Sequence, residues 1–343
     1  MSRETCQETW LLLDSRDIGG IETHVLHLAC ALQVHWGKVR VVFLKKYGEH
    51  PLTDKLNEAQ IPWEYLSGSA YQLFKALSHK PKLLHTHGYK SGIVGRVLAK
   101  GMNLPVVSTF HAGEPGQGKV RFYNFIDNLT AGFGEAIAVS EKIQSRVLSA
   151  THLIPNFVPM PQNQQSKKSS SVAFVGRLSP EKGPDLFCEI AKQNPNLNFM
   201  IYGDGPMRDA LENEFGDNVH FAGQVPSMEQ YWADIGLLCM PSRYEGLPYA
   251  ALEAMANGIP VAAFDVGSLA QAITHNVNGW IAPPKDTEAL SHYIHGWANM
   301  DNQDRKQMSL YAREAIKSKY SPEVIIPQII EIYSKAIVGG RSC

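Results

Sequence analysis

The second half of the chain contains a turn whose side chains suit a phosphorylated ligand. In the stretch 174–183, Arg177 and Lys182 lie five residues apart between glycines. A guanidinium offers a fork of donors and an ammonium offers a point charge, so this pair near a helix start suits a diphosphate. A solvated basic loop would contain the same residues. This turn alone does not separate the two interpretations.

A second turn, in the stretch 201–206, contains Gly203 and Gly205 directly after an apolar run. The pair is similar to half of a dinucleotide-binding fingerprint, but Arg208 stands where a third glycine would be. A tight turn is the simpler explanation of such a pair when it is considered alone.

The third segment carries the strongest signal. Gly246 and Pro248 mark a strand-to-helix turn, and the free amides of such a turn form an anion site. Glu245 precedes the helix and Glu253 lies within it, about 12 Å further along at 1.5 Å per residue. One carboxylate could bind hydroxyls at each end of an extended ligand, such as a sugar and a ribose. Either glutamate alone would most often be a surface or helix-end residue.

The strands and helices that position these turns follow a βα alternation. Open parallel sheets bind ligands beyond the carboxyl ends of their strands, so such an alternation would bring the turns to one edge. Short apolar runs alternate with helix-period segments through two successive series, which predicts two doubly wound α/β domains facing each other. The expected strands are 10–13, 39–44, 82–85, 105–108 and 136–139, then 171–175, 199–202, 234–240 and 260–264.

The domain boundaries follow from composition. Residues 159–171 contain almost nothing apolar, so we expect a first domain over 1–160, a linker over 161–171 and a second domain over 172–320. Ser321 and Pro322 form a helix start, and an apolar stripe follows them. We expect the helix of 321–343 to pack back toward the first domain.

Charge and cysteine content indicate the cellular compartment and the kinds of partner that this protein could have. The formal net charge of -1 divides into 19 Lys and Arg against 13 Asp and Glu over residues 1–170, and 13 against 20 over the remainder. The 5 scattered cysteines show no metal-ligand spacing and suit a reducing compartment. The first ten residues contain no long apolar region, which argues against a signal peptide. We expect a cytoplasmic protein that does not bind nucleic acid.

Histidines and basic residues of the first half could serve an acceptor or a surface. His85 and His87 end a strand at metal-ligand spacing, but the sequence offers no evident third ligand, and we expect no metal site. His24 and His87 are weaker candidates for the acceptor side. The basic residues suggest either a solvated face or peripheral contact with an anionic membrane on its inner face. They are Lys45, Lys46, Lys90, Arg96, Lys119 and Arg121.

Taken together and in this order, the motifs make the chain similar to the retaining glycosyltransferases of family four, which have the GT-B fold. The similarity runs from about residue 10 to 290. Its residues are Gly19-Gly20, His111, Arg177 with Lys182, Gly203-Asp204-Gly205-Pro206, and Glu245 with Glu253. It implies that the second domain binds a nucleotide-sugar, the first binds an acceptor, and transfer takes place in the cleft between them.

The resemblance also implies residue roles on the donor side. Arg177 and Lys182 correspond to the pair that holds the donor diphosphate and stabilises the leaving nucleotide. Glu245 corresponds to the carboxylate that binds hydroxyls of the donor sugar. The backbone amides of Gly246 and Leu247 fall beside the phosphates.

The remaining implied roles involve both domains. Glu253 corresponds to the ribose-binding carboxylate, and the glycines Gly203 and Gly205 fall among the donor-binding residues. Gly19 and Gly20 correspond to a loop that lets backbone approach the diphosphate and the acceptor. His111 corresponds to an active-site histidine near the transferred sugar.

These implications define a metal-independent enzyme without a cofactor. It would transfer a sugar with retention from a nucleotide-sugar, with a uridine diphosphate donor expected. The acceptor would be a hydroxyl of a glycan or a lipid-linked acceptor in polysaccharide biosynthesis. Alternatives are a GT-B nucleotide-sugar epimerase, a phosphorylase, or a non-catalytic sugar-nucleotide binder. The intact set of motif residues favours transfer.

Overall fold

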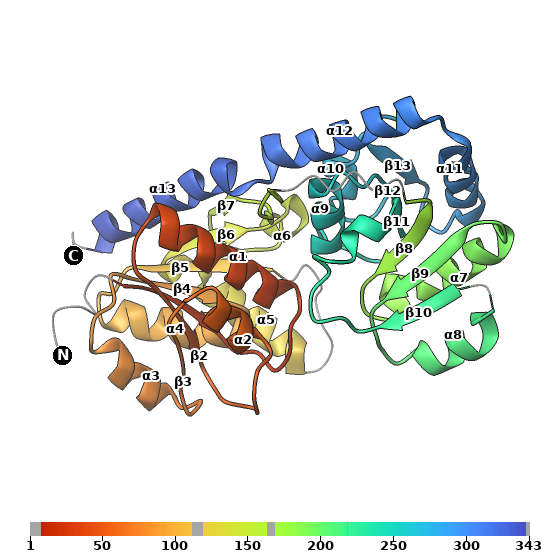
Figure 1. Cartoon of the computed structure of the whole chain (residues 1–343). Helices are drawn as coiled ribbons and strands as arrows, with labels where there is room; N and C mark the ends of the chain where they lie inside the picture. The colour runs from red at the N-terminus through yellow and green to blue at the C-terminus, as the bar shows by residue number, and fades with distance from the viewer. Residues whose placement is uncertain (1–7, 112–118, 163–168, 218, 341–343) are drawn as a thin grey trace. The chain divides into compact units, whose positions relative to one another are not determined.

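The computed structural model describes residues 8–111, 119–162, 169–217 and 219–340. The chain forms two compact units (Figure 1). Unit 1 comprises the residues up to Phe157 together with those from Pro322 onward. Unit 2 comprises Val158–Ser321.

Unit 1 is built on a seven-stranded parallel sheet with the order β3-β2-β1-β4-β5-β6-β7. The order reverses at β1, so the chain segments that follow β1 and β4 diverge and leave a crevice at the carboxyl edge. The strands are β1 (Thr9–Leu13), β2 (Val39–Phe43), β3 (Trp63–Tyr65), β4 (Leu83–His87), β5 (Val106–Phe110), β6 (Glu135–Ala138) and β7 (Thr151–Leu153).

Helices cover both faces of this sheet, and the strand residues alternate accordingly. Leu11 and Leu13 of β1 pack toward α1, α2 and α13, whereas Trp10 and Leu12 pack toward α3 and α4. This two-sided burial explains why β1 is a continuous apolar run. The helices are α1 (Gly20–His35), α2 (Leu52–Glu58), α3 (Ala70–Leu77), α4 (Tyr89–Gly101), α5 (Lys119–Thr130), η2 (Ala131–Phe133), α6 (Glu141–Gln144) and α13 (Pro322–Gly340).

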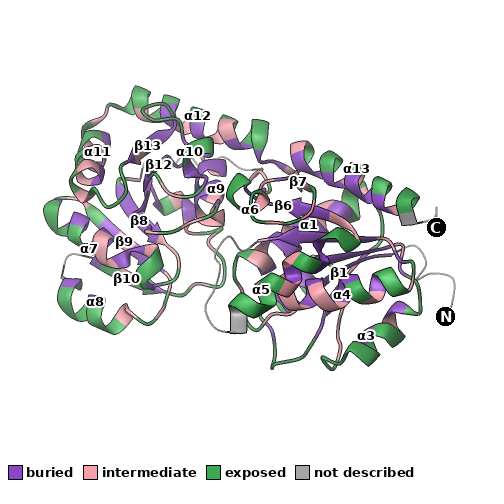
Figure 2. Cartoon of the chain, turned by 180° about the vertical axis from the view of Figure 1, so that it is seen from behind, coloured by how far each residue is buried: buried purple, intermediate pink, exposed green. Residues whose placement is uncertain are grey.

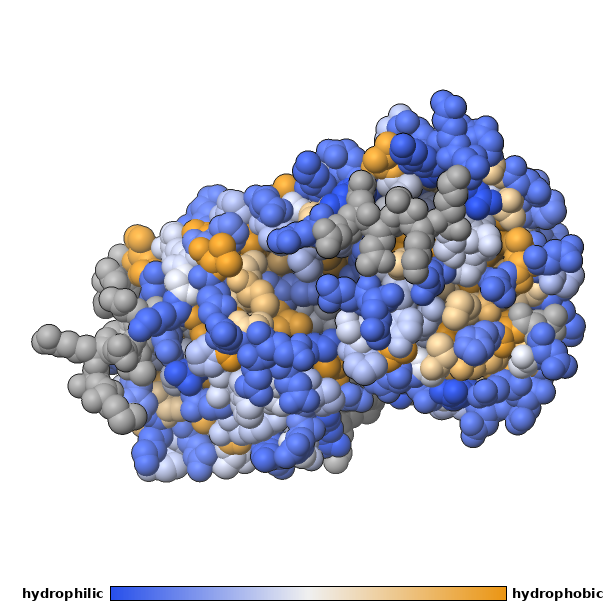
Figure 3. All heavy atoms as spheres, in the orientation of Figure 1, coloured by the Kyte–Doolittle hydropathy of each residue, from blue (hydrophilic) through white to orange (hydrophobic). Residues whose placement is uncertain are grey.

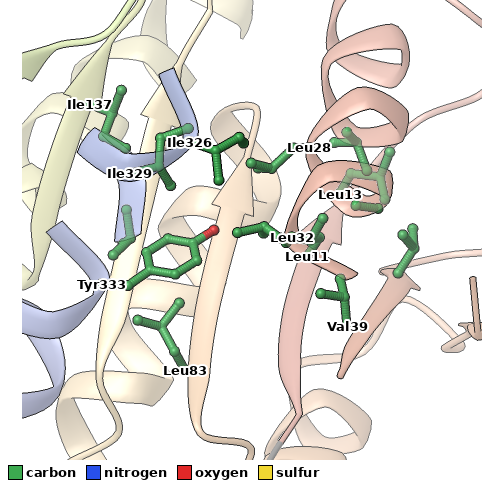
Figure 4. Close-up of a cluster of buried hydrophobic side chains, with 14 of the residues drawn as sticks. Leu11, Leu13, Leu28, Leu32, Val39, Leu83, Ile137, Ile326, Ile329 and Tyr333 are labelled. Atoms are coloured by element: carbon green, nitrogen blue, oxygen red, sulfur yellow. The ribbon is translucent and has the colours of Figure 1, made fainter. Parts of the chain in front are cut away.

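The last helix, α13, completes the core of unit 1. Ile326, Ile329 and Tyr333 are buried beside Leu28 and Leu32 of α1, as Figure 4 shows. The apolar stripe that the sequence shows after Ser321 therefore covers the sheet of unit 1. The end of the chain is a structural part of the unit in which the chain begins.

Unit 2 repeats the doubly wound plan on a smaller scale. Its six-stranded parallel sheet has the order β10-β9-β8-β11-β12-β13, which reverses at β8. The strands are β8 (Ser171–Val175), β9 (Asn198–Tyr202), β10 (Val219–Gly223), β11 (Leu237–Met240), β12 (Val261–Phe264) and β13 (Gly279–Ala282). The helices are η3 (Pro180–Lys182), α7 (Pro184–Gln193), α8 (Arg208–Phe215), η4 (Trp232–Asp234), α9 (Tyr249–Ala256), α10 (Leu269–Ala272), α11 (Thr287–Asn299) and α12 (Asn302–Lys319).

Most of the expected strands differ from the observed ones by one to three residues at an end, and two of the differences have a clear physical reason. The expected strand 234–240 begins only at Leu237, because Trp232–Asp234 forms a short 3-10 helix. The expected strand 82–85 continues to His87, and all five residues of β4 are buried. The last part of β4 contains the polar residues His85 and His87 although it is buried. The apolar run in the sequence stops before them, so it predicts a strand that is too short.

The division of the chain also differs in detail from the expected boundaries. The chain passes from unit 1 to unit 2 after Phe157 and returns after Ser321. Of the expected linker, residues 163–168 lie outside the described residues, and Ser171 already belongs to β8. The strands of the sheet of unit 2 are largely buried, as their purple colour in Figure 2 shows.

Across the described ranges, no helix has both the length and the apolar character that crossing a membrane requires. Hydrophilic residues cover most of the side of the molecule shown in Figure 3, and apolar residues lie among them in small groups.

Candidate functional site

In unit 2, the candidate residues follow the strands at the reversal of the sheet. Arg177 follows β8, Gly203 follows β9, and Glu245 follows β11. Strands β9, β8 and β11 are neighbours in the sheet, so these turns meet at its carboxyl edge. The structure therefore brings together the three segments that the sequence identifies one by one.

An ion pair joins two of these turns. Lys182 Nζ donates to both carboxylate oxygens of Glu245 at 2.8 Å, although 63 residues separate them. The Glu245 side chain is only 5% exposed, and Ser242 Oγ donates to its Oε1 at 2.9 Å. A buried carboxylate with two partners holds one orientation, and the remaining lone pairs can accept from a ligand hydroxyl.

The backbone holds Lys182 against the end of β11. Gly183 follows it with φ of +68°, and a Cβ there would lie 2.2 Å from the carbonyl oxygen of Pro241. Only glycine fits a left-handed turn in such close contact. The contact fixes the spacing between the turns that carry Lys182 and Glu245.

A second ion pair braces the same turns and was not identified from the sequence. Arg243 binds Asp185 in a bidentate manner at 2.8 and 2.5 Å, and its Nη1 also donates to the carbonyl of Pro180. Burial raises the pKa of Asp185, but the hydrogen bonds and charge of Arg243 outweigh it, so the pKa is lowered. The partners lie 58 residues apart, so no local pattern in the sequence would pair them.

Arg177 is the exposed cation of this edge. It lies directly after Gly176, and it is exposed. In contrast to Lys182, whose Nζ is held by Glu245, Arg177 can turn its guanidinium toward a ligand without breaking an ion pair with a described residue. The two predicted cations therefore differ in how firmly they are positioned.

Gly203 and Gly205 have a structural requirement of their own. A Cβ on Gly203 would lie 1.9 Å from the carbonyl oxygen of Gly176, and one on Gly205 would lie 2.5 Å from that of Leu178. The turn after β9 therefore packs directly on the turn that carries Arg177. These glycines shape the site through backbone contact, which supports the tight-turn interpretation of the pair.

Gly246 differs from these glycines because a Cβ there would meet nothing within 4 Å. The residue is exposed beside the start of α9, and Leu247 next to it is buried. Pro248 is the residue before α9 rather than part of its first turn. Glu253 lies within α9 and is half-buried. The open space at Gly246 is where a ligand phosphate can approach the helix N-terminus.

In unit 1, the glycine turn after β1 is occupied by its own helix cap. Gly19 N donates to Glu22 Oε2 at 2.8 Å, and Glu22 is buried. This one-sided cap, from the Glu22 side chain, satisfies the Gly19 amide. Of the two predicted glycines, Gly20 begins α1, so any backbone approach by a ligand involves the following amides rather than that of Gly19.

Three histidines from separate elements meet at the carboxyl edge of unit 1. His24 lies in α1, His87 ends β4 and His111 follows β5. His87 Nδ1 and His111 Nε2 share a hydrogen bond of 3.2 Å, and the rings of His24 and His111 are 4.8 Å apart. We call these three residues the histidine cluster. His24 is only 2% exposed, so it does not face solvent as the sequence allowed.

Burial keeps the histidine cluster uncharged. It lowers the pKa of His111 to about 3, and it lowers the pKa values of His24 and His87 well below their usual range. Neighbouring imidazoles lower the pKa values of His24 and His87 further. Neutral imidazoles both donate and accept hydrogen bonds, which suits them to sugar hydroxyls rather than to phosphates.

His85 has a separate, structural position beneath the histidine cluster. Its Nδ1 bonds to Tyr333 Oη and its Nε2 to Thr109 Oγ1, both at 2.7 Å. Its ring lies 4.2 Å from that of His87. With both nitrogens bonded, His85 is a packed residue that supports His87 and is no ligand candidate.

The cluster also has the donors that a metal site would need. One nitrogen from each of His24, His87 and His111 lies within 4.8 Å of the others. Three neutral imidazoles suit zinc and similar transition metals. The sequence offered no third ligand beside His87, because His24 of α1 and His111 after β5 reach His87 only through the packing of the folded unit.

One of the basic residues that the sequence assigned to a solvated or membrane-contacting face of unit 1 lies in the interior. Arg96 is only 1% exposed, and its Nη2 binds Asp127 Oδ1 at 2.5 Å. Lys90 Nζ donates to Asp14 at 3.0 Å. The side chain of Lys119 lies outside the described residues. The assignment of Arg96 to a solvated face was wrong, because a guanidinium can be buried when its donors are paired.

The two doubly wound units define the GT-B class of glycosyltransferase fold, and solved structures agree. Anabaena HepE in complex with UDP-glucose matches with a TM-score of 0.83 at 20% identity, over 96% of this chain and 99% of that one. A sucrose-phosphate synthase from Thermosynechococcus elongatus matches with a TM-score of 0.79 at 21% identity, over 97% and 100%.

Family models identify the relationship more closely. The model described as Glycosyltransferase Family 4 matches residues 18–160, and the model described as Glycosyl transferases group 1 matches residues 159–315. The chain belongs to the glycosyltransferases of family 4 and group 1.

The first curated relatives are 28% to 30% identical over the stretches that match. A glycogen synthase of Mycobacterium tuberculosis is 23% identical over 393 residues, which cover 94% of this chain and 93% of that protein. An exopolysaccharide phosphotransferase of Streptomyces coelicolor is 28% identical over 198 residues, or 54% of this chain. The matched stretches span 21% to 48% of the length of the first three relatives.

Proposed function

We propose that this protein transfers a sugar, with retention of configuration, from a nucleotide-sugar to a hydroxyl of a glycan or a lipid-linked acceptor. The observation that carries the proposal is the Lys182–Glu245 pair beside the exposed Arg177, at the carboxyl edge of the sheet of unit 2. Complexes of Anabaena HepE with UDP and with UDP-glucose support a uridine diphosphate donor for this chain as well.

The cations explain how the donor would be activated. Transfer breaks the bond between the sugar anomeric carbon and the diphosphate oxygen, so negative charge develops on the leaving diphosphate. Arg177 would meet this charge directly, and Lys182 would share its Nζ between the diphosphate and Glu245. Positive charge placed against the leaving group lowers the barrier electrostatically.

The carboxylates and the helix turn would orient the donor. Glu245, held by Lys182 and Ser242, would accept from hydroxyls of the donor sugar. Glu253 would bind the ribose, and the amides near Gly246 and Leu247 would face the phosphates. This arrangement holds the reacting carbon in place without a covalent bond to the protein.

In our proposal, the acceptor hydroxyl attacks the anomeric carbon from the same face that the diphosphate leaves. The configuration at that carbon is therefore retained. The acceptor oxygen bonds to the anomeric carbon, and its proton passes to the leaving phosphate. His111 would bind a hydroxyl of the transferred sugar as a neutral imidazole, with His87 fixing its orientation. His24 and His87 border the acceptor side.

We propose that this transfer needs neither a metal nor a cofactor. The two side-chain cations and the start of α9 supply the positive potential that a divalent ion would otherwise supply. Chelation with EDTA should therefore leave the rate of transfer unchanged, and restoration of a lost rate by Mg²⁺ or Mn²⁺ would contradict this part of the proposal.

A thermal-shift screen of nucleotide-sugars tests donor binding. A ligand that binds only the native state raises the apparent melting temperature, by an amount that grows with its concentration. We expect UDP-sugars to raise it and Arg177→Ala to abolish the shift.

Product analysis separates the competing functions. Incubation with the bound donor and candidate acceptors should release nucleoside diphosphate together with a glycosylated product. Conversion of the donor into an isomeric nucleotide-sugar would indicate an epimerase instead. Binding without any turnover across the acceptor panel would indicate a sugar-nucleotide binder.

A further inference from the structure

Helix α5 of unit 1 has its apolar residues on the outside. Phe122, Phe125 and Leu129 are 62%, 57% and 55% exposed and recur at helical spacing. The opposite side of the helix buries Asp127 and Thr130. A surface helix ordinarily directs its apolar stripe to the core. In α5 the apolar side faces solvent and the polar side faces the core, and we call this orientation the reversal.

The reversal is built into the packing of α5. Arg96 of α4 is buried beneath it and donates to Asp127 Oδ1 at 2.5 Å and to Thr130 Oγ1 at 2.7 Å. These polar contacts fix which side of α5 faces α4. The aromatic side therefore stays in solvent because the polar side is bonded inside.

The exposed apolar residues continue onto the neighbouring helices. Helices α3, α4 and α5 lie next to one another on one side of the sheet (Figure 2). Isolated apolar residues are normal on a surface, but a series on adjacent helices marks an interaction site. We call this set the apolar face: Tyr71, Phe74, Val97, Phe122, Phe125, Leu129 and Phe133, each at least 40% exposed.

Basic residues predominate on the three helices that carry the apolar face, although Glu64 of β3 lines the same surface hollow as Tyr71 and Lys75. Helices α3, α4 and α5 contain six basic residues and a single acidic one, Asp127. Asp127 is buried and paired with Arg96, whereas Lys75, Lys100 and Arg121 are exposed. The apolar face is thus bordered mainly by positive charge, and these helices offer no exposed carboxylate.

We infer that the apolar face docks on an anionic lipid bilayer. Aromatic side chains that enter the headgroup region and cations that remain at the phosphates are the combination such a surface binds. A second copy of this chain fits less well. In a two-fold contact the same surface of both copies meets, so the positive charges of one copy would face those of the other. Neutral lipid alone would leave the cations unmatched.

Docking would also orient the unit toward a lipid-linked acceptor. Along the chain, α5 is the next described helix after His111 of the histidine cluster. This consequence rests on the proposed transfer reaction, whereas the docking itself does not.

Vesicle flotation tests the inference with the full chain. We expect the protein to float with vesicles of phosphatidylcholine and phosphatidylglycerol and to remain unbound with phosphatidylcholine alone. Raising the salt concentration should reduce binding. The double variant Phe122→Ser/Phe125→Ser should lose about tenfold or more in partitioning, because two aromatic side chains no longer leave water.

A matched control uses exposed apolar residues of unit 2. Leu310 and Tyr311 of α12 are 43% and 47% exposed. Leu310→Ser/Tyr311→Ser should float like the unchanged protein. Equal flotation of the α5 variant and the unchanged protein would overturn the inference, as would binding that is indifferent to phosphatidylglycerol.

Two further readouts distinguish this inference from the proposed function. Transfer to a water-soluble acceptor should be unchanged in Phe122→Ser/Phe125→Ser, and its melting temperature should match that of the control. Failure to float while soluble transfer persists would overturn docking alone. Self-association that the α5 variant abolishes, without flotation, would assign the face to a protein contact and likewise overturn the lipid inference.

Discussion

The candidate sites at the carboxyl edges of the two sheets differ in the charge state of their polar side chains. In unit 2, full charges are paired across turns that lie far apart in sequence, as Lys182 with Glu245 and Arg243 with Asp185. In unit 1, burial keeps the histidine cluster neutral. A site for a diphosphate needs positive potential, whereas a site for hydroxyl groups needs donors and acceptors without net charge. The same fold supplies both because strand-end turns vary independently of the sheet.

The largest effect should come from the exposed cation of unit 2. Arg177→Ala removes a charge that acts mainly on the leaving diphosphate, so turnover should fall by about 10²- to 10³-fold. The melting temperature should stay close to that of the unchanged protein, since the side chain is exposed. Steady-state assays and thermal unfolding check both parts.

The matched control is Arg146→Ala, which removes an exposed arginine from unit 1. It should change neither turnover nor stability. Near-normal turnover of Arg177→Ala would break the comparison, because the positive potential of unit 2 would then play no part in the reaction.

Two glycines of unit 2 should differ in what their substitution changes: one should affect stability and the other donor binding. Gly203→Ala places a Cβ 1.9 Å from a carbonyl oxygen at a φ of +148°, so we expect a loss of about 2–3 kcal/mol of stability. Gly246→Ala adds a methyl group to open space and should leave stability unchanged while it weakens donor binding. Unfolding and nucleotide-sugar titrations measure the two effects. Equal stability of both variants would show that the turn after β9 relaxes freely.

A smaller effect is expected below the histidine cluster. Tyr333→Phe removes the hydroxyl that bonds to His85 Nδ1 in a fully buried position. The orphaned imidazole nitrogen should cost about 1–2 kcal/mol in the free energy of unfolding. Tyr311→Phe, at an exposed position, is the control. Unchanged stability of the Tyr333 variant would mean that the cluster is not supported from α13.

The smallest effect concerns the pH dependence of unit 2. The pKa of Asp185 is lowered in the folded state, so its pairing with Arg243 stabilises the protein above the ordinary carboxyl pKa. This stabilisation is lost as pH falls through the lowered value. Because both side chains are partly exposed, Asp185→Asn should cost no more than about 1 kcal/mol near neutral pH.

Unfolding curves of Asp185→Asn and the unchanged protein at a series of pH values provide the measurement. The difference between them should shrink as the medium becomes acidic. A difference that is constant with pH would show that Arg243 braces the turn without its charge being needed.

The residues that the sequence identified are those whose signal is local. Arg177, Lys182 and Glu245 lie in turns that follow apolar runs, and the order of these turns along the chain suggests a ligand. The sequence also identified Gly19 and Gly203. In the structure, Gly19 caps helix α1 and Gly203 packs against the backbone of Gly176.

What the sequence could not show depends on packing between distant segments. His24 joins His87 and His111 only because α1 lies across the sheet edge. Arg96 looked like a surface charge, since nothing near it in the sequence reveals that Asp127 shares its burial. The outward aromatic residues of α5 follow from that same contact, and a helical period cannot tell the inside of a helix from the outside.

The position of α13 has a consequence for how the protein is made. Unit 1 needs Ile326, Ile329 and Tyr333 to close its core, yet these residues are synthesised only after the whole of unit 2. Domains generally fold in the order in which they emerge from the ribosome. Here the unit that emerges first must wait, with one face of its sheet uncovered, while the second unit can complete its fold before it.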